Sequence, residues 1–368
     1  MTQVEDVHLR PITGGFCHRL NLLSRTTPSK FEPSQVLIRH FGRSDEVQEP
    51  IESNTTLSVS EQGLIYYEMG RRGWGPKVYG LFRGGRLEEW INSHPLTASE
   101  CHDDAGIKRD VARSYARLHS LALPFRKRNF TKVLDEFKDL TAGPSTDRIC
   151  LGLEEMPLCQ AKDFAGILRI TDWNREFTWV GGLFERYHCK RTIAIGDANY
   201  LNILVKTRPG ENVDADSDAN GDSERNVNGQ SECRTMLIDY ETATYSYRGI
   251  DIGGHFNERM YAWNDPNTPF TGYGIPGINE RREFCDSYLG EMRALGQAMT
   301  EYDTVDHLIL ESEIGQLYQL LFSVFMSLDV DGLGQLEDAT LLTGLIHMLE
   351  TYLRLKSDFI LGHQAIDT

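Results

Sequence analysis

IAIGDANYLNILV, residues 193–205, places two polar side chains, Asp197 and Asn202, between two short apolar runs. The runs contain β-branched residues, which favour strands, whereas the glycine and polar residues between them favour a tight connection. The segment therefore predicts two strands joined by a short loop that holds Asp197 and Asn202 five positions apart.

A second polar pair follows the next strand-like segment. In MLIDYE (236–241) an apolar run ends in Asp239, and Glu241 lies two residues further on. Side chains of an extended segment alternate between its two faces, so both carboxylates are expected on the same side. A D-x-x-x-x-N pattern alone often only caps a turn. Combined with a strand-terminating D-x-E it is much more specific.

These two motifs together suit phosphoryl transfer. That reaction needs a carboxylate to accept the proton of the attacking hydroxyl, and oxygen ligands for a Mg²⁺ ion that bridges the nucleotide phosphates. In protein kinases four residues separate the Asp and Asn of the catalytic loop, and a second Asp follows on the next hairpin. Asp197, Asn202 and Asp239 occur in that order, so we expect a kinase-type site.

The beginning of the chain is β-rich. Alternating apolar residues and turn residues predict a small sheet. Its expected strands lie in PITGGFCHRLNLLS (11–24), QVLIRHFG (35–42), KVYGLF (77–82) and RLEEWI (86–91). One segment, SEQGLIYYEM (60–69), has helical character. Residues 1–92 are therefore expected to form a nucleotide-binding lobe of one sheet and one helix.

Helical periodicity dominates after Pro95. The expected helices include DVARSYARLHSLAL (110–123), DWNREFTWVGGLFERY (172–187), LESEIGQLYQLLFSVFMSL (310–328) and LLTGLIHMLETYLRLK (341–356). Their apolar faces include Val111, Tyr115, Leu118 and Ala122 in the first, and Phe177, Val180 and Phe184 in the second. The chain is thus predicted to be an α+β protein whose larger helical lobe, residues 93–368, holds the catalytic loop.

Length and composition indicate a globular protein. No apolar run of the 368 residues approaches the roughly 20 needed to cross a bilayer. The first residues, MTQVEDVHLR, lack the charged start and apolar core of a signal peptide. The seven cysteines are scattered, without a C-x-x-C pair, which argues against disulfide frameworks and zinc sites. We therefore expect a cytoplasmic protein without membrane insertion.

The formal charge of -16 argues against a surface for nucleic acid or anionic membranes, and favours a cationic partner. Much of the excess, seven acids against two arginines, lies in residues 207–233, which contain almost nothing apolar. Such a segment cannot bury enough surface to offset its ordering entropy, so we expect a flexible loop there. The overall charge therefore says little about the substrate.

The residues after Asp239 resemble a known family. LIDYETATYSYRGIDIGGHFNER (237–259) is similar to the signature of choline and ethanolamine kinases, approximately I-D-F-E-Y-S-S-Y-N-Y-R-G-F-D-I-G-N-H-F-x-E-W. GPKVYGLFRGGRLEEWI (75–91) resembles the segment that connects the lobes in that family, and VLIRHFG (36–42) resembles its nucleotide-side strand. The resemblance runs from about Ile12 to about Phe359 and implies a two-lobed, protein-kinase-like fold.

The family resemblance implies a role for each polar residue of the two motifs. Asp197 corresponds to the catalytic base, and Asn202 and Asp239 correspond to the Mg²⁺ ligands, with Glu241 supporting that metal cluster. Asp251 and His255, in DIGGHF, are similar to residues that tie the catalytic loop to the helices of the C-terminal lobe. The implied cofactors are therefore Mg²⁺ and, as co-substrate, ATP.

The resemblance also implies which residues bind ATP. Arg39 stands where the family places an Arg toward the phosphates, and Glu61 is the helix carboxylate expected to hold it. Arg86 is assigned to the same group, together with Gly14 and Gly15, whose lack of a Cβ lets the backbone approach phosphates. The chain departs from the family next to these glycines, with Cys17-His18 in place of the usual Ser/Thr-Asn pair.

Four residues correspond to the family's cation site, namely Glu258, Trp263, Phe322 and Phe325. A quaternary ammonium donates no hydrogen bonds, so proteins bind it with aromatic faces and carboxylates. The two Phe residues are three apart on one helical face, which a core stripe would also produce. Thr242 and Arg259 replace a Tyr and a Trp of the family, so the cage is thinner than usual, and choline is favoured only narrowly over ethanolamine.

Ile195 stands where the family generally has a His that bonds to backbone. Isoleucine keeps the bulk but loses that bond, so we predict slower turnover with the chemistry retained. The resemblance thus implies a kinase that converts choline to phosphocholine for phosphatidylcholine synthesis, and a homodimer formed through the N-terminal lobe. Ethanolamine kinase is the first alternative.

Two further alternatives stay open. The catalytic loop of aminoglycoside phosphotransferases often contains H-G-D, which Gly196-Asp197 partly matches, although the long segment after Asp239 argues against that class. A catalytically dead scaffold that binds nucleotide or pairs with an active relative is the other. Retention of Asp197, Asn202 and Asp239 argues against the scaffold.

Overall fold

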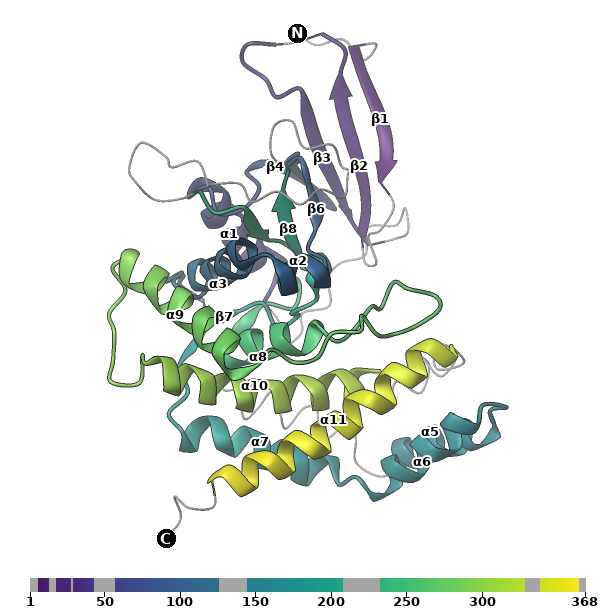
Figure 1. Ribbon diagram of the computed structural model, residues 1–368. Coiled ribbons are helices and arrows are strands. Elements are labelled where there is room, and N and C mark those ends of the chain that lie inside the picture. Colours follow the sequence, from purple (N-terminus) through teal and green to yellow (C-terminus); the bar gives the residue numbers. More distant parts are fainter. Residues whose placement is uncertain are drawn as a thin grey trace. The chain divides into compact units, whose positions relative to one another are not determined.

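A computed structural model describes residues 6–12, 18–27, 29–42, 57–125, 144–207, 232–327 and 338–363. The chain divides into two compact units (Figure 1). The first comprises Met1–Pro95 and Ile203–Thr242, and the second comprises Leu96–Asn202 and Ala243–Thr368. The first crossing lies close to the boundary expected after residue 92. Only one boundary was predicted from the sequence, after residue 92, so Ile203–Thr242 was not assigned to the first unit.

The first unit contains a five-stranded antiparallel sheet with the order β1-β2-β3-β5-β4. Its strands are β1 (Val7–Ile12), β2 (His18–Arg25), β3 (Gln35–Phe41), β4 (Val78–Phe82) and β5 (Gly85–Glu89). The predicted β-rich start is thereby confirmed, with β1 beginning earlier than the expected strand. Arg39 pairs across β3 and β5 with Arg86, so the register brings two arginines together.

Helix α1 (Val59–Arg71) completes the expected sheet-and-helix unit. It begins at a capping box, in which Ser58 and Glu61 satisfy each other's backbone N–H groups. A second, three-stranded sheet has the order β6-β8-β9, with bounds Ser93–Pro95, Ile203–Lys206 and Thr235–Leu237. Strand β8 therefore carries the second apolar run of the opening segment, whereas residues 208–231, where the flexible loop was expected, lie outside the described residues.

The second unit begins with helices α2 (Ala98–Asp103) and α3 (Ala105–His119). Val111, Tyr115 and Leu118 are buried, as their spacing predicted. Ala122 is exposed, because α3 ends before it, with Ser120 as the C-terminal cap. Ala122 is thus exposed because the helix is shorter than predicted, and the buried face of the helix is the one predicted.

Helices α5 (Pro144–Glu155), α6 (Cys159–Ile170) and α7 (Trp173–Arg186) follow. The expected apolar face of α7 is fully buried, with Phe177, Val180 and Phe184 at 0% exposure. These residues belong to one large apolar core that also includes side chains from α5, α6, α10 and α11.

The first run of the opening segment forms β7 (Arg191–Ala194), which pairs antiparallel with β10 (Thr244–Tyr247). A short 3₁₀ turn, η2 (Tyr200–Asn202), then leads into β8. The two predicted strands and their short connection are therefore confirmed. They do not pair with each other, since β8 pairs with β6 and β9 instead.

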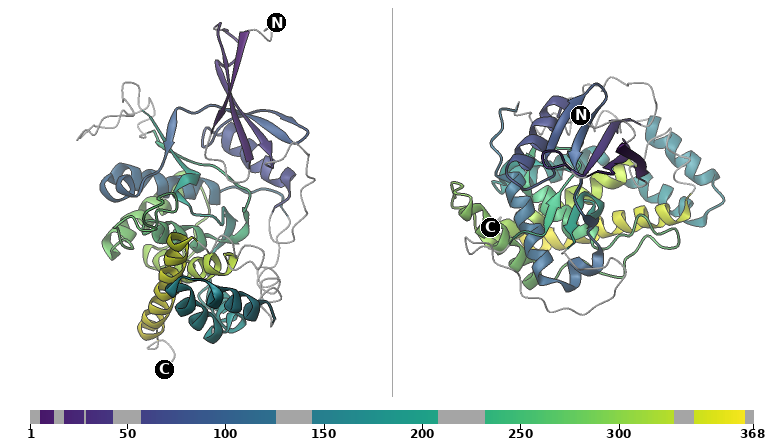
Figure 2. Two further views of the ribbon diagram at one scale, coloured as in Figure 1. Left: turned by 90° about the vertical axis from the view of Figure 1, so that its right-hand side faces the viewer. Right: turned by 90° about the horizontal axis from the view of Figure 1, so that it is seen from above.

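The remaining helices are α8 (Arg248–Glu258), α9 (Ile278–Ala294), α10 (Val305–Met326) and α11 (Ala339–His363). Helix α10 contacts α7, α8, α9 and α11, which surround it in the second unit (Figures 1 and 2). Glycines allow α8 and α10 to approach closely. A Cβ on Gly249 would lie 2.2 Å from the carbonyl oxygen of Glu311, and one on Gly315 would lie 1.7 Å from that of Gly249.

A buried ion cluster joins the start of α8 to α10. Arg248 is fully buried, and its guanidinium donates hydrogen bonds to Glu311 and, at 2.6 Å, to Asp303. Burial alone would lower the pKa of Arg248, but Glu311, Tyr288 and Asp303 outweigh that effect and raise it. Because a buried charge without partners is strongly unfavourable, this cluster fixes how α8 meets α10.

Candidate functional site

The connection between β7 and η2 carries Asp197 in the second unit. The side-chain nitrogen of Asn202 donates a hydrogen bond of 2.8 Å to Oδ2 of Asp197, and the backbone N–H of Asn199 donates one of 3.2 Å to Oδ1. The structure therefore brings the two residues of the D-x-x-x-x-N motif into direct contact. The Asp197 carboxylate is partly exposed and oriented on both of its oxygens.

Asp251 anchors this loop from α8. Its carboxylate accepts hydrogen bonds from the backbone N–H groups of Ile195, at 2.8 Å, and Gly196, at 2.9 Å. Nε2 of His119 lies 2.9 Å from the same carboxylate. Gly196 has a φ of +77°, a conformation that favours glycine. The Ile195 side chain is buried, and the contact of this residue with Asp251 runs through its backbone N–H.

His255, one helical turn after Asp251 on α8, also contacts the loop. The hydroxyl of Tyr200 donates to Sγ of Cys101 and to the carbonyl oxygen of His255, both at 3.2 Å. Nε2 of His255 lies 3.6 Å from the same sulfur. Burial, with a contribution from Arg259, lowers the pKa of His255 to about 3, so its ring is neutral. A buried, neutral histidine packed on the loop is what a supporting residue requires.

Glu258, at the end of α8, is electrostatically coupled to Asp197. Burial and the Asp197 carboxylate raise the pKa of Glu258 to about 8, while a hydrogen bond from Trp263 opposes the shift. Trp263 stacks on Tyr261 with ring centroids 4.9 Å apart and an interplanar angle of 17°. A carboxylate and an aromatic side chain thus lie together near the candidate base.

The two phenylalanines assigned to the cation site lie on α10. Phe325 is buried in the core, where it contacts the rings of Trp173 and Phe177 at centroid distances of 6.1 Å and 5.5 Å. Phe322 is partly buried and stacks on Tyr318. Phe325 therefore has the surroundings of a core residue, which the three-residue spacing allowed from the start. Of the four residues predicted for the cation site, Glu258 and Trp263 are connected by a hydrogen bond.

Asp239 and Glu241 lie in the first unit. Asp239 has a φ of +63°, so the segment is not extended there and the argument from alternating side chains does not apply. The turn nevertheless brings the two carboxylates together. Burial and the charge of Glu241 raise the pKa of Asp239 to about 6, and the buried Oδ1 of Asp239 has no hydrogen-bond partner among the described residues.

Two carboxylates held this close suit a divalent cation, because the cation would stabilise the ionised form of both. The buried Oδ1 of Asp239, which has no hydrogen-bond partner among the described residues, would be available to bind it. Among the described residues, no group of three or more His, Cys, Asp and Glu side chains forms a complete metal site. Magnesium ions in kinases are held by one or two carboxylates together with substrate phosphates. The residues therefore fit a Mg²⁺ ion that takes some of its ligands from the protein and the others from a nucleotide.

Arg39 is 5% exposed, and its Nε donates a 2.9 Å hydrogen bond to Oε1 of Glu88. Nε of Arg86 donates a 2.5 Å bond to the same oxygen. Glu61, expected to hold Arg39, instead accepts hydrogen bonds from the N–H and hydroxyl of Ser58 in the helix cap. The sequence missed Glu88 because the pairing of β3 with β5 positions it.

The same cluster contains a further polar group. Nη2 of Arg86 is buried without a hydrogen-bond partner among the described residues. Burial alone would lower the pKa of Arg39, but Tyr66, Glu88 and Asp239 raise it. Arg39 therefore stays charged beside Glu88 and Asp239. Gly14 and Gly15, also assigned to nucleotide binding, lie outside the described residues.

A contact of His18 was not predicted. His18, at the start of β2, contacts Oε1 of Glu241 through its Nε2. The backbone oxygen of Glu241 accepts a hydrogen bond of 3.3 Å from Gln62 on α1. Although burial would raise the pKa of Glu241, its interaction with His18 lowers it. The departure Cys17-His18 was the signal in the sequence, but only the fold shows its partner.

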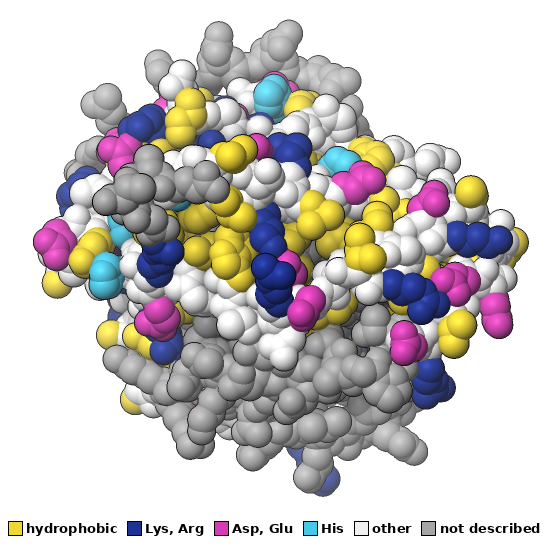
Figure 3. All heavy atoms as spheres, turned by 90° about the horizontal axis from the view of Figure 1, so that it is seen from below, with side chains coloured by type: hydrophobic (Ala, Val, Ile, Leu, Met, Phe, Trp, Pro, Cys, Tyr) yellow, Lys and Arg dark blue, Asp and Glu magenta, His cyan; other side chains and the backbone are white. Residues whose placement is uncertain are grey.

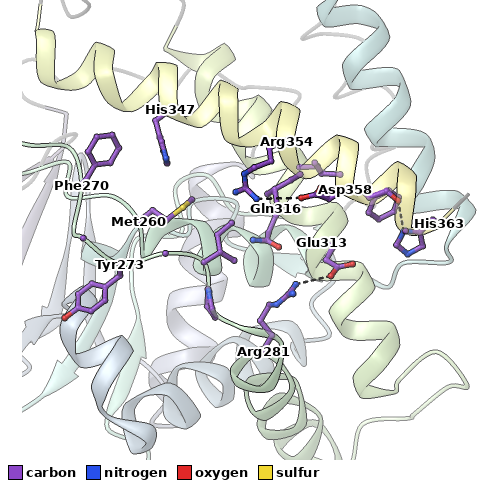
Figure 4. Close-up of a pocket in the computed structure, with 18 residues that line it drawn as sticks. Met260, Phe270, Tyr273, Arg281, Glu313, Gln316, His347, Arg354, Asp358 and His363 are labelled. Atoms are coloured by element: carbon purple, nitrogen blue, oxygen red, sulfur yellow. Dashed lines mark hydrogen bonds and ion pairs between the residues drawn. The ribbon is translucent and has the colours of Figure 1, made fainter.

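A cavity of about 850 Å³ also lies within the second unit (Figure 4). It is bordered by α10, α11 and the segment that follows α8, and its apolar lining includes Met260, Phe270 and Leu355. Arg281 pairs with Glu313 at 3.0 Å, and Arg354 with Asp358 at 3.7 Å, so the charges at the cavity are balanced. None of the residues predicted to bind choline lines it.

The face seen from below is mixed in character (Figure 3). Apolar side chains gather near its middle, and Lys and Arg side chains lie between them with Asp and Glu close by. Among the described residues of this face, the Lys and Arg side chains do not form a continuous basic surface. In the described part of the chain, no helix has both the length and the apolar character needed to span a membrane.

The chain is similar in sequence to known choline/ethanolamine kinases. The sequence model of the family described as Choline/ethanolamine kinase matches residues 9–341. A human protein described as choline/ethanolamine kinase is 28% identical over 308 residues, which are 79% of this chain and 65% of that protein. The chain thus spans slightly less than two thirds of the length of this relative.

Solved structures show the same fold. A choline kinase from Cryptosporidium parvum Iowa II has a TM-score of 0.64 and 17% identity, covering 97% of this chain and 91% of its own. An ethanolamine kinase from Plasmodium vivax has a TM-score of 0.57 and 17% identity, covering 96% and 84%. The predicted α+β, two-lobed, protein-kinase-like fold is confirmed.

Proposed function

The chain belongs to the choline/ethanolamine kinase family, and on that premise we propose that it transfers the γ-phosphoryl group of ATP to the hydroxyl of an amino alcohol. Choline is the proposed substrate and phosphocholine the product. The observation that best supports this proposal is the electrostatic coupling of Glu258 to Asp197 within the second unit. It combines a carboxylate for a cationic head group with a carboxylate for proton transfer.

Asp197 is the proposed base. As the substrate oxygen forms its bond to the γ-phosphorus, the bond from that phosphorus to the β,γ-bridging oxygen breaks and ADP leaves. The hydroxyl proton moves to a carboxylate oxygen of Asp197. Hydrogen bonds from Asn199 and Asn202 orient that carboxylate, and the backbone contacts to Asp251 hold the loop in place. Such positioned proton acceptors contribute about 10²- to 10⁴-fold to rates.

Asn202, Asp239 and Glu241 are the residues proposed to hold Mg²⁺. A bound Mg²⁺ ion offsets negative charge on the phosphates. The Nδ2 group of Asn202 is engaged with Asp197, which leaves its carbonyl oxygen as the possible ligand. Support from the structure comes from the first unit, where Asp239 keeps a buried oxygen without a partner among the described residues.

The first unit is proposed to bind ATP. Arg39 and Arg86 supply positive charge for the phosphates, and Glu88, rather than Glu61, holds both guanidinium groups. Nη2 of Arg86, which has no hydrogen-bond partner among the described residues, is the group proposed to meet a phosphate oxygen. Gly14 and Gly15 keep their proposed role in backbone contacts to the phosphates, from the family resemblance alone.

The second unit is proposed to bind the cation through Glu258 and Trp263. An aromatic face attracts a quaternary ammonium by about 0.5 to 2 kcal/mol, and the carboxylate adds charge. The burial of Phe325 in the core removes one expected ring. That observation favours ethanolamine as a second candidate, because its N–H groups can donate hydrogen bonds and require fewer rings.

A competition assay tests the proposal. The protein would be incubated with ATP, Mg²⁺ and equal concentrations of choline and ethanolamine, and the products measured by mass spectrometry. We expect phosphocholine to exceed phosphoethanolamine. Phosphoethanolamine in excess would establish the second candidate instead. Absence of both products, with folding verified, would refute the kinase proposal and favour a scaffold.

Two wider roles follow from the proposal. The product would enter phosphatidylcholine synthesis as its head group, and the protein would act in the cytoplasm. A homodimer formed through the first unit is proposed from the family resemblance. Sedimentation equilibrium would test it, since a monomer at micromolar concentration would contradict the dimer without affecting the proposed chemistry.

A further inference from the structure

His18 occupies a position where this chain departs from its family, and it contacts a carboxylate of the proposed metal site. Nε2 of His18 contacts Oε1 of Glu241, although the two residues lie far apart in the sequence. The His18 side chain is 13% exposed and that of Glu241 is 25% exposed. The contact is therefore largely shielded from water, where it is stronger than a surface pair.

A second contact fixes the orientation of the His18 ring. The backbone N–H of Gly42 donates a 3.1 Å hydrogen bond to Nδ1 of His18. In the neutral ring, a nitrogen that accepts a hydrogen bond carries no proton, so the proton lies on Nε2. The protonated nitrogen is therefore the one that contacts Oε1 of Glu241. Packing of the ring on Phe41, at a centroid distance of 5.4 Å, restricts it further.

Glu241 is thus held at both of its ends. Gln62 donates to its backbone oxygen, and His18 contacts one oxygen of its carboxylate. The same carboxylate interacts with Asp239, whose pKa it raises. Because the chain at Asp239 is in a left-handed turn, the backbone alone does not hold Glu241 in a strand, and its side chain needs an external support.

We propose that His18 is a positioning residue for the metal site, which orients Glu241 toward Asp239 and the Mg²⁺ ion. This inference rests on the proposed function, because it presupposes that Asp239 and Glu241 bind metal. His18, which replaces the family's usual Asn, would thus hold in place a carboxylate of the proposed metal site. Hydrogen-bond partners of metal ligands typically change metal affinity by about 10- to 100-fold when removed.

Three substitutions separate the two contacts of His18. In His18→Gln the amide nitrogen can take the place of Nε2 and keep the contact with Glu241. In His18→Asn the shorter amide can keep the contact with Gly42 but does not reach Glu241. His18→Leu removes both contacts. His40→Asn is the matched control, since His40 lies on the neighbouring strand and its ring contacts Phe82.

The measurement is equilibrium binding of Mn²⁺ to the full chain saturated with ADP, followed by the electron paramagnetic resonance of free Mn²⁺. We expect the dissociation constant to rise about tenfold in His18→Asn and His18→Leu. His18→Gln should stay within about threefold of the unaltered protein, and His40→Asn should not differ from it. On a Glu241→Gln background, His18→Leu should add less than about twofold, because its partner is already lost.

The outcomes distinguish this inference from the proposed function. If Asp239→Asn weakens Mn²⁺ binding but His18→Leu and His18→Asn do not, the positioning role of His18 is wrong while the metal site stands. If Asp239→Asn also leaves binding unchanged, the metal site of the proposed function is itself wrong, and the inference fails with it. Thermal unfolding of each variant shows whether it is folded, and His18→Gln and His18→Asn remain informative if His18→Leu is not.

Discussion

The side-chain amide of Asn202 donates a 2.8 Å hydrogen bond to the carboxylate of Asp197. Asp197 is thereby oriented by a residue that also has a carbonyl oxygen left for a cation. The loop that carries both is tied to α8 by backbone hydrogen bonds to Asp251. The residues proposed for proton transfer and for metal binding, and the position of their loop, are therefore linked through a few contacts, which the following predictions separate.

Replacing Asp197 by Asn should abolish turnover. The amide cannot accept the proton of the substrate hydroxyl, so we expect kcat to fall by about 10³-fold or more. Affinity for ATP, measured by calorimetry, should stay within about threefold, because the phosphates are assigned to other residues. Turnover comparable with the unaltered protein would exclude Asp197 as the base.

Choline affinity should increase with pH. Burial and Asp197 raise the pKa of Glu258 to about 8, so near neutral pH the side chain is largely protonated and attracts a cation poorly. Choline itself does not titrate. We expect its dissociation constant to fall about tenfold between about pH 7 and pH 9, as the carboxylate forms. Calorimetry with the unaltered protein and with Glu258→Gln, which should show no pH dependence, measures this effect.

The raised pKa of Glu258 also predicts that the stability of the protein falls as pH rises, whereas choline affinity increases. Because the folded-state pKa of Glu258 is raised, its contribution is fully present below the ordinary pKa of glutamate and is lost as pH rises through about 8. In the absence of substrate, the urea midpoint should therefore decrease across that range. Glu258→Gln should decrease less, and an equal decrease in both proteins would assign the effect to another group.

Replacing Asp251 by Asn should slow the reaction more than any change at Ile195. The amide offers a weaker acceptor to the backbone N–H groups of Ile195 and Gly196, and we expect kcat to fall by about 10- to 100-fold. Ile195→His restores the residue usual in the family, yet both backbone bonds remain. It should raise kcat by no more than about threefold. A larger gain would mean that the isoleucine impairs the enzyme more than its backbone anchoring suggests.

Replacing Gly344 by Ala should disturb Trp263. A Cβ at Gly344 would lie 2.7 Å from Cζ3 of that indole, so the ring must move. We expect KM for choline to rise by about three- to tenfold with kcat nearly unchanged. Gly362 lies on the same helix and a Cβ there meets nothing within 4 Å. Gly362→Ala should therefore leave KM unchanged, and equal effects of both substitutions would point to the helix rather than to Trp263.

Replacing Arg248 by Met should destabilise the second unit. The change leaves Glu311 and Asp303 buried without their cation, and we expect a loss of about 3 to 5 kcal/mol in the free energy of unfolding. Arg282 pairs with Asp306 on the surface, where the two side chains are 50% and 77% exposed. Arg282→Met should cost less than about 1 kcal/mol. Urea unfolding followed by circular dichroism compares the two variants.

Several elements could be predicted from the sequence because their signals are local. The apolar face of α7 was expected from the spacing of Phe177, Val180 and Phe184, and all three are fully buried. The spacing of Asp197 and Asn202 placed both on one short loop, and the structure shows a hydrogen bond between their side chains there. The family and the fold were identified from a continuous segment after Asp239, and the matching family covers residues 9–341.

Other features depended on residues distant in the sequence, and only the tertiary structure decided them. Glu88 rather than Glu61 contacts Arg39, because strand pairing places it there and α1 uses Glu61 in its own cap. Phe325 lies in the core because α7 packs against α10. The partner of His18 is 223 positions away in the sequence (241 − 18). Hydrophobic periodicity and motif spacing determine what a segment forms, whereas the partner of a charged side chain depends on how segments pack.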